Sequence, residues 1–165
     1  MPLGSPPFGR VAIVGVGLIG GSLAGAVRRV WPSIEILALD RPDVLADAAA
    51  RRLIDRQAHT VSELADADLI VVATPVPEIL TILPAIAALR SNPVVTDVGS
   101  TKRRICQAAA EAGLSRFVGG HPVAGSERPG LDSARPDLFD GQPWLLVSTP
   151  CSPHKAESCL AVSGS

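Results

Sequence analysis

The sequence predicts an α/β fold of the Rossmann type, in which a doubly wound and mostly parallel sheet carries helices on both faces. Two observations favour this fold. Short, uninterrupted apolar runs alternate with amphipathic stretches along most of the chain, and such runs are typical of parallel strands that are buried on both sides. The first run leads into a glycine-rich turn, G-x-G-x-x-G, at residues 15–20, which is typical of the first strand-to-helix connection in such folds.

The apolar pattern also places the individual elements. Strands are expected where aliphatic residues run without interruption, and helices where apolar residues recur every three to four positions. Pro32 ends the first helix, Gly113 caps the last one, and Pro84 should kink or split the third. In chain order we expect a strand at 10–16, a helix at 18–30, a strand at 34–39, a helix at 44–53, a strand at 69–73, a helix at 78–89, a strand at 93–97, a helix at 101–112, and strands at 116–119 and 144–148.

Composition argues against several classes of function. The chain has 165 residues, of which 47% are hydrophobic, so it can bury the core of one domain. A formal net charge of −1 and 3% aromatic residues argue against a nucleic-acid or membrane partner. The apolar runs are short, so we expect no secretion signal and no membrane span. The three cysteines, Cys106, Cys151 and Cys159, lack metal-ligand spacing, which favours reduced thiols, no metal site and a cytoplasmic location.

The glycine-rich turn is the first candidate binding element. Gly15 would permit the tight turn, Gly17 would let a pyrophosphate approach the backbone, and Gly20 would let helix and strand pack closely. The N–H groups at the helix start, at Leu18 and Ile19, and the positive end of the helix dipole favour phosphate. The alternative is a turn that only packs a helix on a sheet. The preceding strand and following helix favour a dinucleotide site.

An acidic residue follows at the spacing that such a site requires. Asp40 ends the second expected strand, twenty residues after Gly20. Its carboxylate would accept hydrogen bonds from ribose hydroxyls and repel a 2′-phosphate, which predicts NAD in preference to NADP. Arg41 would stack on the adenine or weaken that preference. The alternative for Asp40 is a solvated turn residue before Pro42.

Two more loops follow strands at the same edge of the predicted sheet. Thr74 and Pro75 begin a stiff loop with two prolines, where the nicotinamide half of a dinucleotide should lie. An equal alternative is that these residues only end the strand. Asp97 ends the next strand, and Ser100 follows in a loop that offers hydroxyl groups to a cofactor. The alternative is that Ser100 or Thr101 simply caps the next helix.

His121 is the candidate general base. We expect it in the loop after the strand at 116–119, where small residues surround it and Pro122 stiffens the backbone. The pKa of an imidazole suits proton transfer near neutral pH. A single loop histidine is more often an ordinary polar residue, and we place His59 and His154 in that class.

Four motifs together resemble the nucleotide-binding domain of the prephenate/arogenate dehydrogenase family of tyrosine biosynthesis. They are VGVGLIGGS at 14–22, TPV at 74–76, DVGSTK at 97–102 and GHPVAGSE at 120–127. Residues 138–139 and 144–150 also look like the family's closing strand, so the resemblance covers about residues 10–150.

The resemblance implies an oxidoreductase that binds a small-molecule substrate and catalyses an oxidative decarboxylation. His121 would accept the proton of the substrate hydroxyl, and Ser100 would orient His121 and the nicotinamide. Ser126 and Glu127 would lie near the substrate entrance. The glycine turn and Asp40 would hold NAD.

The chain also departs from the family, which has a second, all-helical domain that dimerises and grips the substrate. We expect an NAD-binding domain at 1–150 and a tail or stub of the helical domain at 151–165. We expect the helical domain to be absent from this sequence, and therefore weak or no activity from the chain alone and no stable family homodimer. The sequence gives no basis for assigning a substrate-binding role to Arg128 or Arg135.

Three alternatives to a prephenate dehydrogenase stay open. The first is an arogenate dehydrogenase, because the residues that would distinguish the two substrates lie outside this sequence. The second is another dehydrogenase of the superfamily with a lysine base, for which only Lys102 and Lys155 are available. The third is a non-catalytic NAD-binding module, which would not need Ser100 and His121 to converge.

Overall fold

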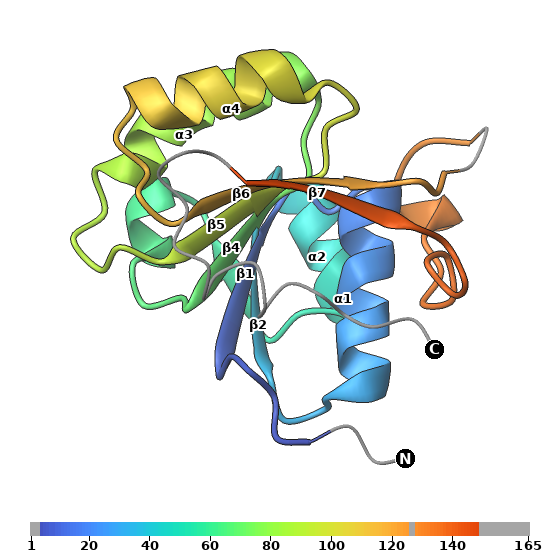
Figure 1. Cartoon of the computed structure of the whole chain (residues 1–165). Helices are drawn as coiled ribbons and strands as arrows, with labels where there is room; N and C mark the ends of the chain where they lie inside the picture. Colours follow the sequence, from blue (N-terminus) through green and yellow to red (C-terminus); the bar gives the residue numbers. More distant parts are fainter. Residues whose placement is uncertain (1–3, 126–127, 149–165) are drawn as a thin grey trace.

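The structure is a computed structural model that describes residues 4–125 and 128–148. Seven strands and four α-helices alternate along these residues, with two short 3-10 helices between them (Figure 1). In chain order they are β1 (Arg10–Val14), α1 (Leu18–Val30), β2 (Glu35–Leu39), α2 (Pro42–Ala50), β3 (Arg56–Ala58), η1 (Val61–Leu64), β4 (Leu69–Val72), α3 (Val76–Ala87), β5 (Val94–Asp97), α4 (Lys102–Glu111), β6 (Phe117–Pro122), η2 (Leu131–Ser133) and β7 (Trp144–Ser148).

The strands form one sheet in the order β3-β2-β1-β4-β5-β6-β7. Every neighbouring pair is parallel except β6 and β7, which run antiparallel. The first six strands have the order of a doubly wound dinucleotide-binding sheet, and β7 adds one antiparallel edge strand. The predicted fold class is therefore confirmed.

Two hydrophobic cores lie on opposite faces of this sheet. Successive strand residues point to opposite faces, so Val11 and Ile13 of β1 pack against α1 and α2, while Ala12 and Val14 pack against α3 and α4. Figure 1 shows the same division, with α1 and α2 on one face and α3 and α4 on the other. Burial on both faces explains why the strands carry uninterrupted apolar runs.

Some element boundaries differ from the prediction. Strand β3 was missed because it has only three residues and two of them are exposed. Helix α3 begins at Val76, so Pro77 lies in its first turn rather than in a loop; the missing N–H costs nothing there. Pro84 lies inside α3 without ending it: the helix continues to Ala87, and the N–H of Ala88 bonds to the Pro84 carbonyl at 3.2 Å.

The carboxyl ends of the parallel strands meet at one edge of the sheet, the upper edge in Figure 1. Helix α1 starts at this edge, and the turns after β1, β2, β4 and β5 all lie there. Ligands of open parallel sheets bind in this position. Among the described residues, the helices are all too short or too polar to cross a membrane.

Candidate functional site

The glycine turn after β1 has the geometry that a dinucleotide requires. Gly15 has a φ of 90°, and a Cβ there would lie 2.8 Å from Thr74 Cγ2. A Cβ on Gly20 would lie 1.9 Å from the Gly15 carbonyl oxygen, so only glycine lets α1 pack on this turn. A Cβ on Gly17 would meet no atom within 4 Å, which leaves its backbone open to a ligand.

The start of α1 supplies donors for an anion. The N–H of Gly21 bonds to the Gly17 carbonyl at 2.8 Å and closes the first helical turn. The amides of Leu18, Ile19 and Gly20 precede that bond and belong to the helix end that lacks intrahelical acceptors. Arg28 and Arg29 occupy the last turn of the helix. The open end at Gly17 therefore presents N–H groups and the positive dipole end to a phosphate.

Asp40 connects the end of β2 to the glycine turn. One carboxylate oxygen accepts the Val16 N–H at 2.6 Å, and the other accepts the Arg41 N–H at 2.7 Å. A carboxylate can accept about four hydrogen bonds, so capacity remains for ribose hydroxyls. Asp40 is thus a fixed acceptor, not the freely solvated turn residue of the alternative interpretation.

A pocket of about 340 Å³ opens beside Asp40 and Gly17. Arg41, Asp43 and Val44 line one side of it, and Gly130, Leu131 and Asp132 line the other. Arg41 is largely exposed and lies 3.4 Å from Asp43. The pocket has the position expected for an adenosine half next to the pyrophosphate turn.

The wall at η2 is a part of this pocket that the sequence did not reveal. Arg51, the residue after the end of α2, donates to Asp47 and to Asp132, so it joins α2 to η2 beside the pocket. The hydrogen bonds that Arg51 donates to Asp47 and then to Asp132 raise its pKa above the ordinary value. Arg51 and Asp132 are 81 positions apart in sequence, and no local sequence pattern indicates that they pair.

Thr74 lies directly beneath the glycine turn. Its methyl group is the atom that a side chain at Gly15 would strike. Its hydroxyl oxygen is buried and finds no hydrogen-bond partner within the described residues. Pro75 follows as the N-terminal cap residue of α3. A buried hydroxyl without a partner is costly, and a ligand at this edge would provide one.

Asp97 has a role inside the protein. Its side chain is fully buried, accepts the N–H groups of Gly99 at 2.8 Å and of Gly120 at 3.2 Å, and pairs with Lys102. Burial raises the pKa of this carboxyl group, while the hydrogen bond from Lys102 opposes the increase. The Asp97 side chain thus bonds to groups inside the protein, and the cofactor contact predicted for it stays a prediction.

Ser100 lies on the surface just after Gly99. Thr101, not Ser100, occupies the N-cap position of α4, and it makes no side-chain capping bond. The Ser100 hydroxyl makes no hydrogen bond to any other described side chain or backbone group. It is consequently available to a ligand.

His121 lies in strand β6 and not in the loop that the sequence predicted. Pairing with β7 extends β6 to Pro122, and His121 stands opposite Leu145. The imidazole is half buried, and its Nδ1 atom has no partner in the part of the chain that the structure describes. The end of β6 depends on antiparallel pairing with β7, a strand more than twenty positions away. The residues Gly, His and Pro there are not typical of a strand, so the sequence did not predict it.

Other predicted residues cannot be placed. Ser126, Glu127 and the tail at 151–165 lie outside the described residues. Within the described residues there is no group of three His, Cys, Asp or Glu side chains that could hold a metal ion.

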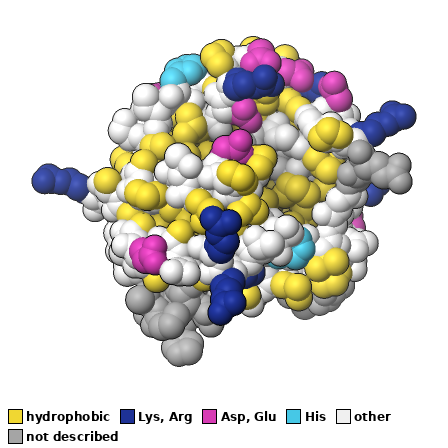
Figure 2. All heavy atoms as spheres, turned by 90° about the horizontal axis from the view of Figure 1, so that it is seen from above, with side chains coloured by type: hydrophobic (Ala, Val, Ile, Leu, Met, Phe, Trp, Pro, Cys, Tyr) yellow, Lys and Arg dark blue, Asp and Glu magenta, His cyan; other side chains and the backbone are white. Residues whose placement is uncertain are grey.

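The surface over the site combines apolar and charged groups. Figure 2 views the molecule from above, toward the edge where the parallel strands end. Hydrophobic side chains gather around a hollowed centre on this face, and Lys, Arg, Asp and Glu side chains lie between and around them. Such a surface suits a ligand with both flat apolar and charged parts.

The fold and the site together define a dinucleotide-binding domain of the Rossmann class. The chain matches the family described as prephenate dehydrogenase, nucleotide-binding domain, over residues 23–162. It belongs to this family, which confirms the resemblance. The glycine turn precedes the matched residues, so its assignment depends on the geometry above.

Relatives and solved structures agree with this membership. Prephenate dehydrogenase of Lactococcus lactis subsp. cremoris is 37% identical over 143 residues, which cover 84% of this chain and 40% of the relative. Prephenate dehydrogenase from A. aeolicus, in complex with hydroxyphenyl propionate and NAD+, has a TM-score of 0.85 and 29% identity, over 96% of this chain and 56% of that one. Arogenate dehydrogenase of Synechocystis has a TM-score of 0.85 and 33% identity, over 92% of this chain and 54% of that one. The chain therefore spans about half the length of these proteins.

Proposed function

We propose that this chain is the cofactor-binding part of an NAD-dependent prephenate dehydrogenase, which converts prephenate to 4-hydroxyphenylpyruvate and CO2. One observation carries the proposal. The buried Asp97 carboxylate binds the N–H groups of Gly99 and Gly120, the residues just before Ser100 and His121. The backbone that precedes Ser100 and the backbone that precedes His121 are thus held by one carboxylate, at the sheet edge that carries the glycine turn.

The residues at this edge fit NAD. The open backbone at Gly17 and the amides of Leu18 and Ile19 would hold the pyrophosphate, and Gly15 and Gly20 shape the turn that presents them. Bound NAD would supply the acceptor for the hydride of the substrate. Thr74 and Pro75 would border its nicotinamide half, where the Thr74 hydroxyl needs a partner.

Asp40 supports NAD in preference to NADP. Its carboxylate is held by two backbone N–H groups and would accept the adenosine ribose hydroxyls. A 2′-phosphate at the same place would meet this negative charge. Arg41, the cation that would offset the repulsion, already lies near Asp43.

His121 would act as the general base. When the substrate carbon that bears the hydroxyl group loses hydride, the hydroxyl proton must leave for a carbonyl to form. An imidazole within hydrogen-bond reach accepts that proton. The ring carboxylate then leaves as CO2, its electron pair completes the aromatic ring, and the ring oxygen takes up a proton to become the phenol.

Ser100 would orient this base. The Nδ1 atom of His121 is buried without a partner in the described residues, and the Ser100 hydroxyl is also unengaged. A hydrogen bond from one to the other would fix the imidazole. Ser126 and Glu127 would add polar contacts near the substrate entrance.

An arogenate dehydrogenase is the second candidate. The similarity to the Synechocystis arogenate dehydrogenase favours it. Arogenate differs from prephenate in carrying an amino acid side chain in place of a keto acid, and the reaction at the ring is the same. Ser100 and His121 would then keep their roles. A non-catalytic NAD-binding module is the third candidate, and it would use only the glycine turn and Asp40.

Calorimetric titration with NAD and NADP tests the cofactor, and His121→Asn tests the base. We expect NAD to bind more tightly than NADP, and we expect weak turnover because the chain spans about half of its relatives. In the NAD complex, hydroxyphenyl propionate should shift the ring resonances of His121 in an NMR titration and leave those of His59 unchanged.

His121→Asn should bind NAD as the wild type does. Its residual turnover of prephenate should fall on the order of 100-fold, as expected for loss of a general base. His59→Asn, at an exposed position, is the matched control. The dehydrogenase proposal fails if NAD does not bind, or if the ligand leaves the His121 resonances unchanged.

A further inference from the structure

The ion pair between Asp97 and Lys102 differs from the other ion pairs of the described chain. Its side chains are 0% and 16% exposed, whereas in the remaining pairs both partners are at least 27% exposed. A buried pair of this kind contributes little net stability, because desolvation of the two charges offsets their attraction. Its presence at the edge that carries the candidate site therefore calls for another explanation.

Both charged groups contact the same residue, Gly120. Asp97 accepts the Gly120 N–H at 3.2 Å, and the Lys102 ammonium donates to the Gly120 carbonyl oxygen. That carbonyl belongs to the peptide bond that leads into His121. The backbone just before the imidazole is thus held on both sides by one ion pair.

The same carboxylate also holds the loop of Ser100. Asp97 accepts the Gly99 N–H at 2.8 Å, and Lys102 begins helix α4 two residues after Ser100. A Cβ at Gly99 would lie 3.0 Å from the Asp97 carboxylate, and a Cβ at Gly120 would lie 2.5 Å from the Asp97 backbone oxygen. Both glycines therefore permit this close approach.

We propose that Asp97 and Lys102 are positioning residues, which set the backbone of Ser100 and His121 relative to each other so that hydroxyl, imidazole and substrate align. This inference rests on the proposed function, and it adds residues to it. Neither side chain contacts the substrate; the pair acts through Gly99 and Gly120. A misplacement of about 1 Å in such a site costs on the order of 100-fold in rate.

Three variants separate positioning from stability: Asp97→Asn, Lys102→Met and the double variant. Each single change leaves one buried group without its counter-ion or its full set of partners, so we expect a clear fall in melting temperature. The double variant removes both charges, and we expect it to recover most of that loss. It should still turn over prephenate on the order of 100-fold more slowly, with KM for prephenate and Kd for NAD changed less than about threefold.

A second readout does not depend on turnover. In the NAD complex of the wild type, hydroxyphenyl propionate should shift the His121 ring resonances, and in the double variant this response should shrink or vanish. Arg28→Met with Asp55→Asn is the matched control. In that pair Asp55 likewise accepts hydrogen bonds from a cation, the Arg28 guanidinium at 2.6 Å, and from a backbone N–H, that of Ile36 at 2.8 Å. It lies, however, beside the amino end of β2. The control should lower the melting temperature alone.

The outcomes also separate this inference from the proposed function. If the wild type does not bind NAD, or binds it without the His121 response, the proposed function fails. If the wild type does both and the double variant keeps wild-type turnover and the full His121 response, the pair is only structural and the positioning role is wrong.

Discussion

Asp40 serves two purposes with one carboxylate. Its bonds to the Val16 and Arg41 N–H groups fix the glycine turn against the end of β2. Its remaining capacity lies in the pocket beside Gly17. The residue that shapes the turn is thus also the one that would distinguish a ribose from its 2′-phosphate.

We expect Asp40→Asn to weaken NAD binding by about tenfold, because hydrogen bonds from ribose hydroxyls to a charged acceptor would become bonds to a neutral amide. The affinity for NADP should fall less than that for NAD, or should rise, since the repulsion between Asp40 and the 2′-phosphate disappears. Calorimetric titration with both cofactors measures the change in their ratio.

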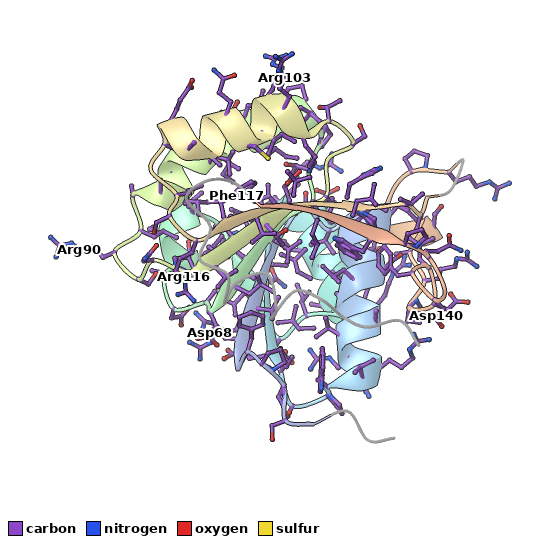
Figure 3. All side chains as sticks on the ribbon, in the orientation of Figure 1. Asp68, Arg90, Arg103, Arg116, Phe117 and Asp140 are labelled. Atoms are coloured by element: carbon purple, nitrogen blue, oxygen red, sulfur yellow. The ribbon has the colours of Figure 1, made fainter. Side chains whose placement is uncertain are left out.

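Asp68→Asn is the matched control for this change. Asp68 also accepts two backbone N–H groups, those of Gly9 and Arg10, both at 2.9 Å. It lies at the opposite edge of the sheet, at the lower left of Figure 3. The control should reduce stability without altering either affinity, and an equal loss of NAD affinity in both variants would contradict a direct role for Asp40.

At the scale of elements, the start of α1 separates packing from binding. Gly20 faces the Gly15 carbonyl, and Gly17 faces open space. The same substitution at two positions, three residues apart, should therefore have opposite consequences.

Gly20→Ala should destabilise the domain by about 1–3 kcal/mol or prevent folding, because the added methyl group overpacks the contact between helix and turn. Gly17→Ala should keep the melting temperature within a few degrees and weaken NAD binding at least about tenfold, since the methyl group occupies the space that a pyrophosphate needs. Thermal unfolding and calorimetry measure the two effects. If Gly17→Ala binds NAD as tightly as the wild type, the pyrophosphate does not lie at this turn.

The elements that the sequence revealed are those whose signals are local. The buried runs of β1, β2, β4 and β5 and the glycine turn each lie within a few consecutive residues, and all of them were predicted. The boundary of β6 was not, because its last residues depend on pairing with β7. A sequence pattern detects an apolar run, but it does not detect a partner strand.

The site divides in the same way. Asp40 stands at a recognisable distance from the glycines, so it could be predicted. The link from Asp97 to Gly120 joins residues 23 positions apart, and the link from Arg51 to Asp132 joins residues 81 apart. Such contacts exist only once the sheet order brings the strand ends together, so they required the structure.

Across the whole molecule, folding lowers the pKa of some carboxyl groups and raises that of another. Hydrogen bonds from Arg56, together with Arg10, lower the pKa of Asp66. Burial raises the pKa of Asp55, but hydrogen bonds from Arg28 and the Ile36 N–H outweigh it, and the net change is downward. For Asp97 burial dominates and the pKa is raised. Hydrogen bonds from Thr60 and Arg29 likewise lower the pKa values of Glu63 and Asp140, and all these groups contribute to the pH dependence of stability.

The sign of each contribution follows from proton linkage. A carboxyl group whose pKa is lowered by folding stabilises the protein above its unfolded pKa, about 3.9 for Asp. That stability is lost as the pH falls through the folded value. Asp97 has the opposite sign: its contribution is complete below about pH 3.9 and is lost as the pH rises through its raised pKa.

Between about pH 4 and 2 the contribution of Asp97 no longer changes, whereas those of Asp66 and Asp55 are lost, so the free energy of unfolding should fall as the pH decreases through this range. Asp66→Asn should flatten this part of the curve, because the carboxyl group that must take up a proton is gone. Asp137→Asn, in an exposed pair at 3.7 Å from Arg135, should leave its slope unchanged. Urea unfolding at a series of pH values measures the slope. An Asp66→Asn curve that stays as steep as the wild type between about pH 4 and 2 would show that the cluster of Arg10, Arg56 and Asp66 does not stabilise the fold through ionised Asp66.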